Sequence, residues 1–210
     1  MRRHDAYPTW EAWWEAGRPE AMSWAEFLDA TDQWVEKGSH SGPEPSERLA
    51  DYTKLNRARM RRLAKTLQLP VGISSQLEAL DAGAHHWVLI TESWCGDGAY
   101  TGAMVAAMAR LAGVQMEVVL RDGSNGIISD FMTNGGLSVP IWVLADAEGH
   151  VKGFWGPRPQ ALGALVAGWR NADDPKMSKT EVAQAVQRWY IADKGVSFFE
   201  EAAELLMVEE

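Results

Sequence analysis

The stretch Trp87-Val88-Leu89-Ile90-Thr91-Glu92-Ser93-Trp94-Cys95-Gly96-Asp97-Gly98 decides the fold of this chain. Residues 87–91 are apolar or β-branched and predict a buried strand. A polar turn follows, and it holds Cys95, the only cysteine among 210 residues. Because residues 99–112 then follow a helical pattern, we expect Cys95 at the junction between a strand and a helix N-terminus.

Cys95 is the candidate nucleophile of this turn. Unpaired backbone N–H groups at a helix N-terminus stabilise a thiolate, and such sites lower a cysteine pKa from about 8.5 to roughly 3.5–7.5. The carboxylate of Asp97 opposes this effect, because a second negative charge beside it is disfavoured. A lone cysteine can instead be a small buried apolar residue. The position at a strand-to-helix junction favours an exposed and reactive Cys95 over a buried one.

The elements after this helix predict the rest of an α/β fold. A strand is expected at Gln115–Leu120, a short helix at 127–132, and a hairpin of strands at 141–145 and 151–155. A helix at 160–169 closes the unit. The order β-α-β-α-β-β-α predicts a central mixed sheet flanked by helices.

The turn and a later proline resemble the thioredoxin superfamily. In that family a tryptophan and a cysteine end a strand before a helix, as Trp94 and Cys95 do here. A hydrophobic residue and a cis-proline then lie beside the cysteine and pair with an extended substrate segment. The matching residues are Val139 and Pro140. The resemblance therefore implies a thioredoxin-like fold with extra N- and C-terminal helices, and a substrate groove at Val139 and Pro140.

Further motifs are similar to those of a bacterial group of thioredoxin-like proteins. They are the helix at 52–66, the turn Glu92-Ser93-Trp94-Cys95-Gly96-Asp97, and the segments Leu120-Arg121-Asp122, Thr133-Asn134-Gly135-Gly136 and Trp155-Gly156-Pro157-Arg158-Pro159. Together they span about half of the chain. The likeness implies the fold and does not supply a biochemical role.

Two departures from ordinary thioredoxins limit the expected chemistry. The second cysteine of the family lies three residues after the first, and this position is Gly98. The buried carboxylate of the family lies six residues before the first cysteine, and this position is Leu89. With one cysteine the chain cannot form an internal disulfide. The resemblance therefore implies a thiol-disulfide oxidoreductase that acts through Cys95 and an external resolving thiol.

In this hypothesis the substrate is a protein disulfide or a small thiol, and glutathione is the candidate co-substrate. Trp94 would form a wall of the site, and Gly96 and Gly98 would let the ligand backbone approach. Asp97 would modulate the thiolate. The two arginines that could hold an anionic thiol ligand are Arg121 and Arg158.

Two alternatives remain open. The first is a redox-inactive protein-binding module that uses the proline loop and the aromatic helices, with Cys95 incidental. The second rests on single-cysteine glutaredoxins, whose Cys-Gly-x-Ser turn resembles residues 95–98. That resemblance implies an iron–sulfur cluster held by two chains and two glutathiones.

Composition divides the chain into three predicted parts. Residues 1–45 form a tryptophan-rich helical extension and a polar linker. Residues 46–170 form the thioredoxin-like domain with its preceding helix, and residues 171–210 form a C-terminal helical extension with a break at 171–175. Helices of these parts should begin at Ser23 with Glu26, at Ser46, and at Ser178 with Glu181.

Charge and motif content exclude other classes of function. The formal net charge is −9 and the pI is near 5.1, which disfavours nucleic acid as a partner. No apolar run approaches 18 residues, and the first residues lack the apolar core of a secretory signal, so a cytoplasmic protein is expected. No metal-ligand spacing or nucleotide motif is present, and the histidines are expected at the surface.

Overall fold

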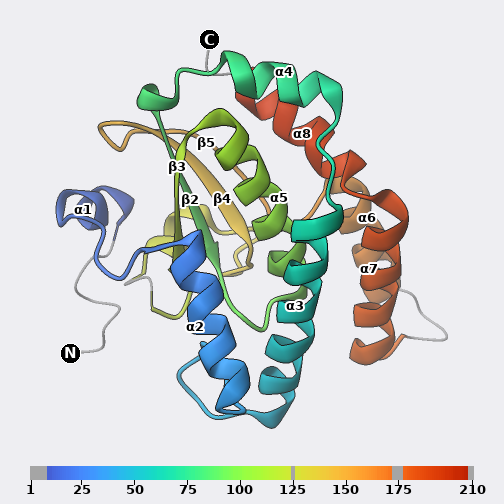
Figure 1. Cartoon of the computed structure of the whole chain (residues 1–210). Helices are drawn as coiled ribbons and strands as arrows, with labels where there is room; N and C mark the ends of the chain where they lie inside the picture. The colour runs from blue at the N-terminus through green and yellow to red at the C-terminus, as the bar shows by residue number, and fades with distance from the viewer. Residues whose placement is uncertain (1–8, 124–125, 172–176, 208–210) are drawn as a thin grey trace.

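The computed structural model of the chain describes residues 9–123, 126–171 and 177–207. A five-stranded sheet of order β1-β3-β2-β4-β5 forms its centre (Figure 1). The strands are β1 (Met22–Ser23), β2 (His85–Thr91), β3 (Gln115–Leu120), β4 (Ile141–Asp146) and β5 (Val151–Trp155). Strands β2 and β3 are parallel, and every other neighbouring pair is antiparallel. The prediction of a central mixed sheet is therefore confirmed, and the strand predicted at 87–91 lies at its centre as part of β2.

The helices lie around this sheet. They are α1 (Trp10–Glu15), α2 (Trp24–Glu36), α3 (Glu47–Thr66), α4 (Val71–Ala79), α5 (Gly96–Ala112), α6 (Gln160–Asn171), α7 (Lys179–Asp193) and α8 (Val196–Met207), with the 3-10 turns η2 (Ala82–Ala84) and η3 (Ile127–Phe131). The predicted caps at Ser23, Ser46 and Ser178 are all present. The predicted break after α6 lies, beyond Asn171, outside the described residues. No helix in the described ranges combines the length and the apolar composition needed to cross a membrane.

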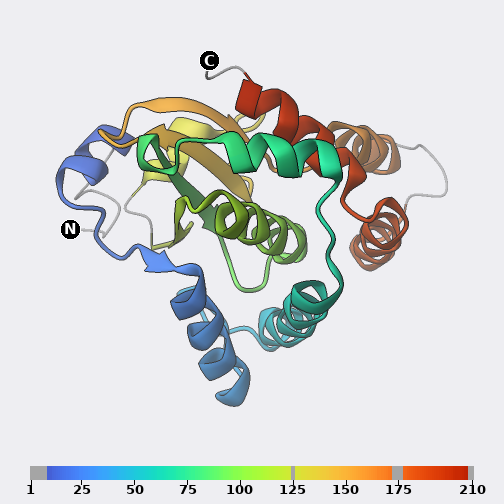
Figure 2. The ribbon, with the colours of Figure 1, turned by 45° about the horizontal axis from the view of Figure 1, so that its top comes forward.

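Two apolar cores form because successive side chains of a strand point to opposite faces of the sheet. Trp87 and Leu89 of β2 belong to the core that α2 to α8 cover. Val88 and Ile90 belong to the opposite core, which α1 and η3 cover. Figures 1 and 2 show α1 apart from the other helices, on its own side of the sheet.

Two elements were missed by the sequence patterns. Strand β1 is only two residues long, and it pairs with β3 through Met22 and Ser23. Helix α4 begins after Pro70, which provides no side-chain cap, and only Ile73 and Leu77 are buried. Neither element carries a periodic signal long enough to detect in a sequence.

The β4–β5 hairpin ends the sheet on the other side. Trp142 of β4 pairs with Trp155 of β5 at one end of the hairpin, and Ala145 pairs with Val151 at the other. The register shifts between Leu144 and Ala145. The shift is a bulge that places an unequal number of residues on the two strands. The predicted hairpin around residues 146–149 is confirmed.

Replacement of Trp13 tests whether α1 is part of the folded core. Trp13 is fully buried, and its indole Nε1 donates to the Pro19 carbonyl at 3.1 Å. Trp13→Ala should therefore lower the free energy of unfolding by about 3–5 kcal/mol, as measured by urea denaturation. Glu11→Ala changes an exposed residue of the same helix and should change this free energy by less than about 0.5 kcal/mol. Equal effects of both variants would contradict a core role for α1.

Candidate functional site

Cys95 lies at the N-cap of α5 and contacts the proline loop. Its Sγ accepts a hydrogen bond from the Gly98 N–H at 3.3 Å and donates one to the Val139 carbonyl at 3.3 Å. The bond between Val139 and Pro140 is cis. The structure thus brings the turn and the proline loop together, in the arrangement that the resemblance implied.

The expectation of an exposed Cys95 is wrong. Only 7% of the residue is exposed, and it belongs to the core on the α1 face with Ile90 and Val139. Burial raises the pKa of Cys95 to about 12, and the negative charge of Asp97 adds to the effect. The hydrogen bond from the Gly98 N–H and the positive charge of Arg158 lower the pKa of Cys95, but they do not cancel the effects of burial and Asp97. Cys95 is therefore a neutral thiol at neutral pH.

Asp97 forms a buried ion pair with Arg158 beside this thiol. Oδ2 of Asp97 lies 2.6 Å from Nη2 of Arg158, which comes from the segment between β5 and α6. Burial opposes the charge on Arg158, yet the neighbouring Asp97 raises the pKa of this guanidinium. Burial and then Asp97 also raise the pKa of Tyr190, which α7 places beside the pair. Arg158 therefore pairs with Asp97, and its role toward an anionic ligand stays a prediction.

The turn glycines adjoin side chains of the chain itself. A Cβ at Gly98 would clash with Oγ1 of Thr91. A Cβ at Gly96 would lie 3.3 Å from Nε2 of Gln187 on α7 and 3.7 Å from Nη1 of Arg59 on α3. An added side chain at either glycine would thus meet side chains of the protein itself. The approach of a ligand backbone at Gly96 and Gly98 stays a prediction.

Trp94 and Arg121 form a stacked pair next to Cys95. The Arg121 guanidinium lies 5.0 Å from the centre of the Trp94 ring. Arg121 also pairs with Asp122 at 2.7 Å, and this hydrogen-bonded carboxylate raises the pKa of Arg121. The second arginine predicted for an anionic ligand is therefore shared between an aromatic ring and a carboxylate.

Sequence reasoning missed a contact between the α2–α3 linker and the turn. Ser41 Oγ donates to the Glu92 carboxylate and accepts from the Ser93 N–H at 3.0 Å. The Ser41 N–H donates to Ser93 Oγ at 3.0 Å. From α3, Thr53 Oγ1 lies 2.9 Å from Ser93 Oγ, and Asn56 donates to the Ser93 carbonyl at 2.9 Å. The linker and α3 together fix the backbone before Cys95.

Glu92 completes this polar network. Its Oε1 accepts from the Asp122 N–H at 2.9 Å. Burial raises the pKa of Glu92, and the hydrogen bonds from Ser41 and Asp122 offset this effect only in part. No sequence signal marks Ser41 as a partner, because serine, glycine and proline in a linker are equally typical of a solvated loop.

Two histidines are buried, although the sequence placed them at the surface. His40 Nδ1 accepts from the Gly42 N–H at 3.0 Å within the linker. His86 begins the buried part of β2, where Nε2 lies 2.9 Å from Glu117 and the ring packs edge-on against Trp14. Both are held by local or cross-strand partners that a sequence pattern does not show.

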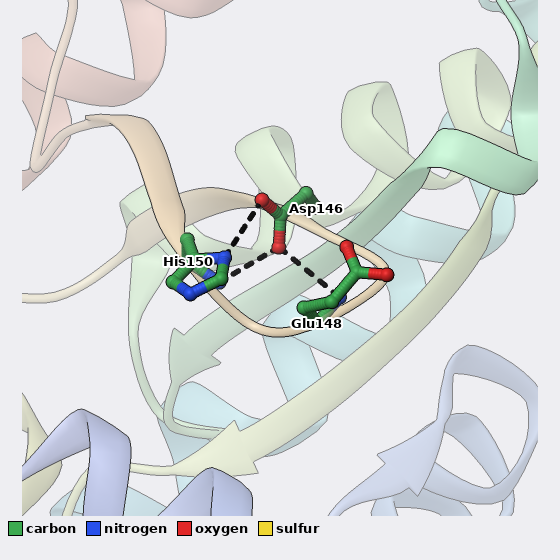
Figure 3. A group of neighbouring side chains, drawn as sticks. All are labelled: Asp146, Glu148 and His150. Carbon is green, nitrogen blue, oxygen red and sulfur yellow. Dashed lines mark hydrogen bonds and ion pairs between the residues drawn. The ribbon is translucent and has the colours of Figure 1, made fainter.

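A cluster of possible metal ligands caps the β4–β5 hairpin (Figure 3). Within the described residues, ligand atoms of Asp146, Glu148 and His150 lie within 4.8 Å of one another. Asp146 Oδ1 accepts the N–H groups of Glu148 and His150 at 3.1 and 2.8 Å. Its Oδ2 pairs with His150 Nδ1 and Lys152 Nζ, both at 3.0 Å. Burial opposes ionisation, but the bonds from Lys152 and His150 hold the pKa of Asp146 well below its usual range. Asp146 thus acts as the cap of the turn.

The ionisation of Cys95 can be measured by alkylation with iodoacetamide. Because the pKa is about 12, the rate in the folded protein should rise up to pH 10 without a plateau. At pH 8 the urea-unfolded protein should react about 100-fold faster, since its cysteine has an ordinary pKa. Mass spectrometry gives both rates. A plateau below pH 9 in the folded protein would disprove the raised pKa.

A neighbouring carboxylate gives the matched comparison for this experiment. Asp97→Asn removes a charge that raises the pKa of Cys95, so alkylation of the folded protein should be faster at each pH. Asp29→Asn removes an equal charge from an exposed position of α2 and should leave the rate unchanged. If both variants matched the wild type, Asp97 would have no part in the thiol's ionisation.

A thermodynamic cycle tests the packing at Gly98. Gly98→Ala should lower the free energy of unfolding by about 1–3 kcal/mol, because the added methyl group meets Thr91 Oγ1. Thr91→Ala removes this atom, which has no hydrogen-bond partner within the described residues. The double variant should therefore lose less free energy of unfolding than the two single variants together, by at least about 0.5 kcal/mol. Additive effects in urea denaturation would show that the two residues do not interact.

Comparisons with solved structures support the fold. A crystal structure of an HIV epitope-scaffold superposes with a TM-score of 0.53 and 14% identity, covering 89% of this chain and 98% of that chain. A 1.5 Å crystal structure of a protein of unknown function from Pseudomonas aeruginosa superposes with a TM-score of 0.52 and 17% identity. The superposition covers 89% of this chain and 96% of that chain. At these identities the likeness concerns the fold alone.

Comparison with protein families gives the relationship. A search of curated proteins found no match. A family model described as thioredoxin matches residues 42–174, from the linker beside the turn to the end of α6. The match includes Cys95, the proline loop and Arg158, and it covers more than half of the chain. On this match and this fold, the chain belongs to the thioredoxin family.

Proposed function

We propose that this protein is a redox-inactive thioredoxin-fold module that binds an apolar protein segment beside the Val139–Pro140 loop. The observation that carries the proposal is the state of Cys95, a buried thiol with a pKa of about 12. The thiolate is the species that attacks disulfides. With this pKa, the thiolate is a very small fraction of the protein at pH 7.

The absence of a second thiol supports the same conclusion. The chain has one cysteine, so no internal thiol can release a mixed disulfide. At Gly98 a larger side chain would meet Thr91. The turn is therefore better suited to packing α5 against the proline loop than to thiol–disulfide exchange.

An exposed apolar pair beside the proline loop supplies the binding surface. Thr133 and Gly136 exchange two backbone hydrogen bonds at 3.0 Å and close a tight turn. Met132 and Leu137 flank this turn and are 51% and 46% exposed. The bridge between Thr133 and Gly136 brings the chain on either side of it together, so the proposal takes Met132 and Leu137 as one apolar surface. Leu137 is two residues from Val139, so the exposed pair lies next to the proline loop in the sequence.

A reductase assay tests the lack of redox activity. The wild type and Cys95→Ser should reduce a glutathionylated peptide at the same background rate, with glutathione and glutathione reductase present. Insulin reduction with dithiothreitol should likewise not differ between the two proteins. A rate that exceeds the background and disappears in Cys95→Ser would overturn the proposal.

Site-directed photocrosslinking tests the binding surface. A benzophenone amino acid at Leu137 should crosslink a partner in an extract of the source organism, and Cys95→Ser should leave this product unchanged. The matched control is Val71 on α4, an apolar residue that is 84% exposed. Met132→Asp should remove the product at Leu137. The same product at Val71, or its loss in Cys95→Ser, would contradict binding at this loop.

The contact between Cys95 and the proline loop favours a second candidate function. Sγ lies 3.3 Å from the Val139 carbonyl, where the family resemblance places a substrate disulfide. In this candidate Cys95 loses its proton and attacks a disulfide, so that one new S–S bond forms and one thiol leaves with that proton. Glutathione then restores the Cys95 thiol and carries away the bound group as a disulfide. The Cys95→Ser assay above decides between the two functions.

A further inference from the structure

A groove on the helical side of the molecule is separate from the Cys95 turn. It has a volume of about 410 Å³ and is lined by residues of α2, α3 and α5. Figure 1 shows α2 and α3 side by side, and α3 also packs against α5. Volumes of this size are typical of small-molecule sites, which are mostly apolar with a few polar groups. An interaction here does not depend on the proposed function of the turn.

The floor of the groove is made of small apolar residues. Ala103, Ala106 and Ala107 of α5 line it, and their spacing places them on one face of the helix. Trp24 and Leu28 of α2 form one wall, and Leu63 of α3 contributes to the other. Methyl groups at the floor leave a channel with apolar sides, which suits a flexible alkyl chain.

The rim of the groove is positively charged. Arg57, Arg61, Lys65 and Arg110 line it, and the described lining contains no aspartate or glutamate. Arg57 and Arg61 pair with Asp32 of α2 at 2.6 and 2.7 Å. Lys65 and Arg110 are exposed, and neither takes part in an ion pair within the described ranges. These two cations are therefore available to an anion, in a chain whose net charge is −9.

The position of the two cations fits one end of a bound chain. Helices α3 and α5 run alongside each other, with Arg62 bonded to the Tyr100 hydroxyl at 3.3 Å. Lys65 lies one helical turn beyond Arg61, away from the Asp32 pairs, and Arg110 lies in the last turn of α5. Lys65 thus lies beyond the arginines that Asp32 neutralises, and Arg110 lines the same groove from α5.

We propose that this groove binds a free fatty acid, with the alkyl chain on the alanine floor and the carboxylate at Lys65 and Arg110. The apolar walls favour the alkyl chain of the ligand. The positively charged rim favours an anionic head group over a cationic one on an alkyl chain of the same length. The volume lies in the range of small-molecule sites, and this argues for a single-chain ligand. Each buried methylene group then adds to the affinity.

Isothermal titration with dodecanoate below its micellar concentration tests the proposal. One dodecanoate should bind per chain, and the Cys95→Ser protein should bind equally well. Dodecyltrimethylammonium has the same chain with a positive head group and should bind at least about tenfold more weakly. Butyrate, which keeps the carboxylate and shortens the chain, should not bind detectably. Equal binding of the cationic and anionic amphiphiles would overturn the proposal.

Charge variants test the rim. Lys65→Glu/Arg110→Glu should weaken dodecanoate binding by about tenfold or more. Lys54→Glu/Lys179→Glu makes the same change in net charge at two other exposed positions and should bind like the wild type. Equal losses in both double variants would show a general charge effect and no site at the rim.

Filling the groove tests the floor. Ala107→Phe should abolish binding, and Ala106→Phe provides a second variant at a partly exposed position of the same floor. Ala192→Phe, on the exposed surface of α7, is the matched control, and urea denaturation verifies that each variant is folded. Binding that survives in a folded groove-filled variant, or binding to phosphatidylglycerol vesicles without binding to dodecanoate, would overturn the proposal.

Discussion

The ion pair between Asp97 and Arg158 is the interaction on which the rest of the site depends. It joins the first turn of α5 to the segment after β5 and places a fixed carboxylate next to Cys95. Removal of one member of a buried pair costs roughly 3–5 kcal/mol, because the other charge is left without a partner. The pair therefore does two things. It keeps α5 against the end of the sheet, and it holds two opposed charges beside Cys95. The Asp97 carboxylate makes a second negative charge at Cys95 unfavourable, and the Arg158 guanidinium offsets this effect in part.

Local patterns in the sequence were sufficient for the fold. The apolar run at 87–91 is buried because β3 and β4 pair with its two edges, and helices cover both of its faces. The capping boxes at Ser23 and Ser178 form as expected, since all their hydrogen bonds join residues within one turn. The position of Val139 beside Cys95 also followed, because it depends on the order of strands that the family shares.

The state of the site did not follow from the sequence, because its determinants are distant in the chain. Cys95 is buried through contacts with Val139 and neighbouring core residues, and Gly96 faces Gln187 of α7. Ser41 reaches Glu92 across about 50 residues. A helix N-terminus alone favours a thiolate, whereas the folded surroundings favour the thiol. Tertiary contacts thus keep Cys95 as a thiol, although its local position at a helix N-terminus favours a thiolate.

The two edges of the sheet hinder copies of this chain from pairing with each other through their strands. Strand β1 covers β3 with only two residues, and β5 carries a bulge against β4 with Lys152 on the strand. A very short edge strand, a bulge and a lysine each hinder another strand from extending the sheet. Among the described strands, neither border of this strongly apolar sheet therefore offers a long, regular template for intermolecular pairing.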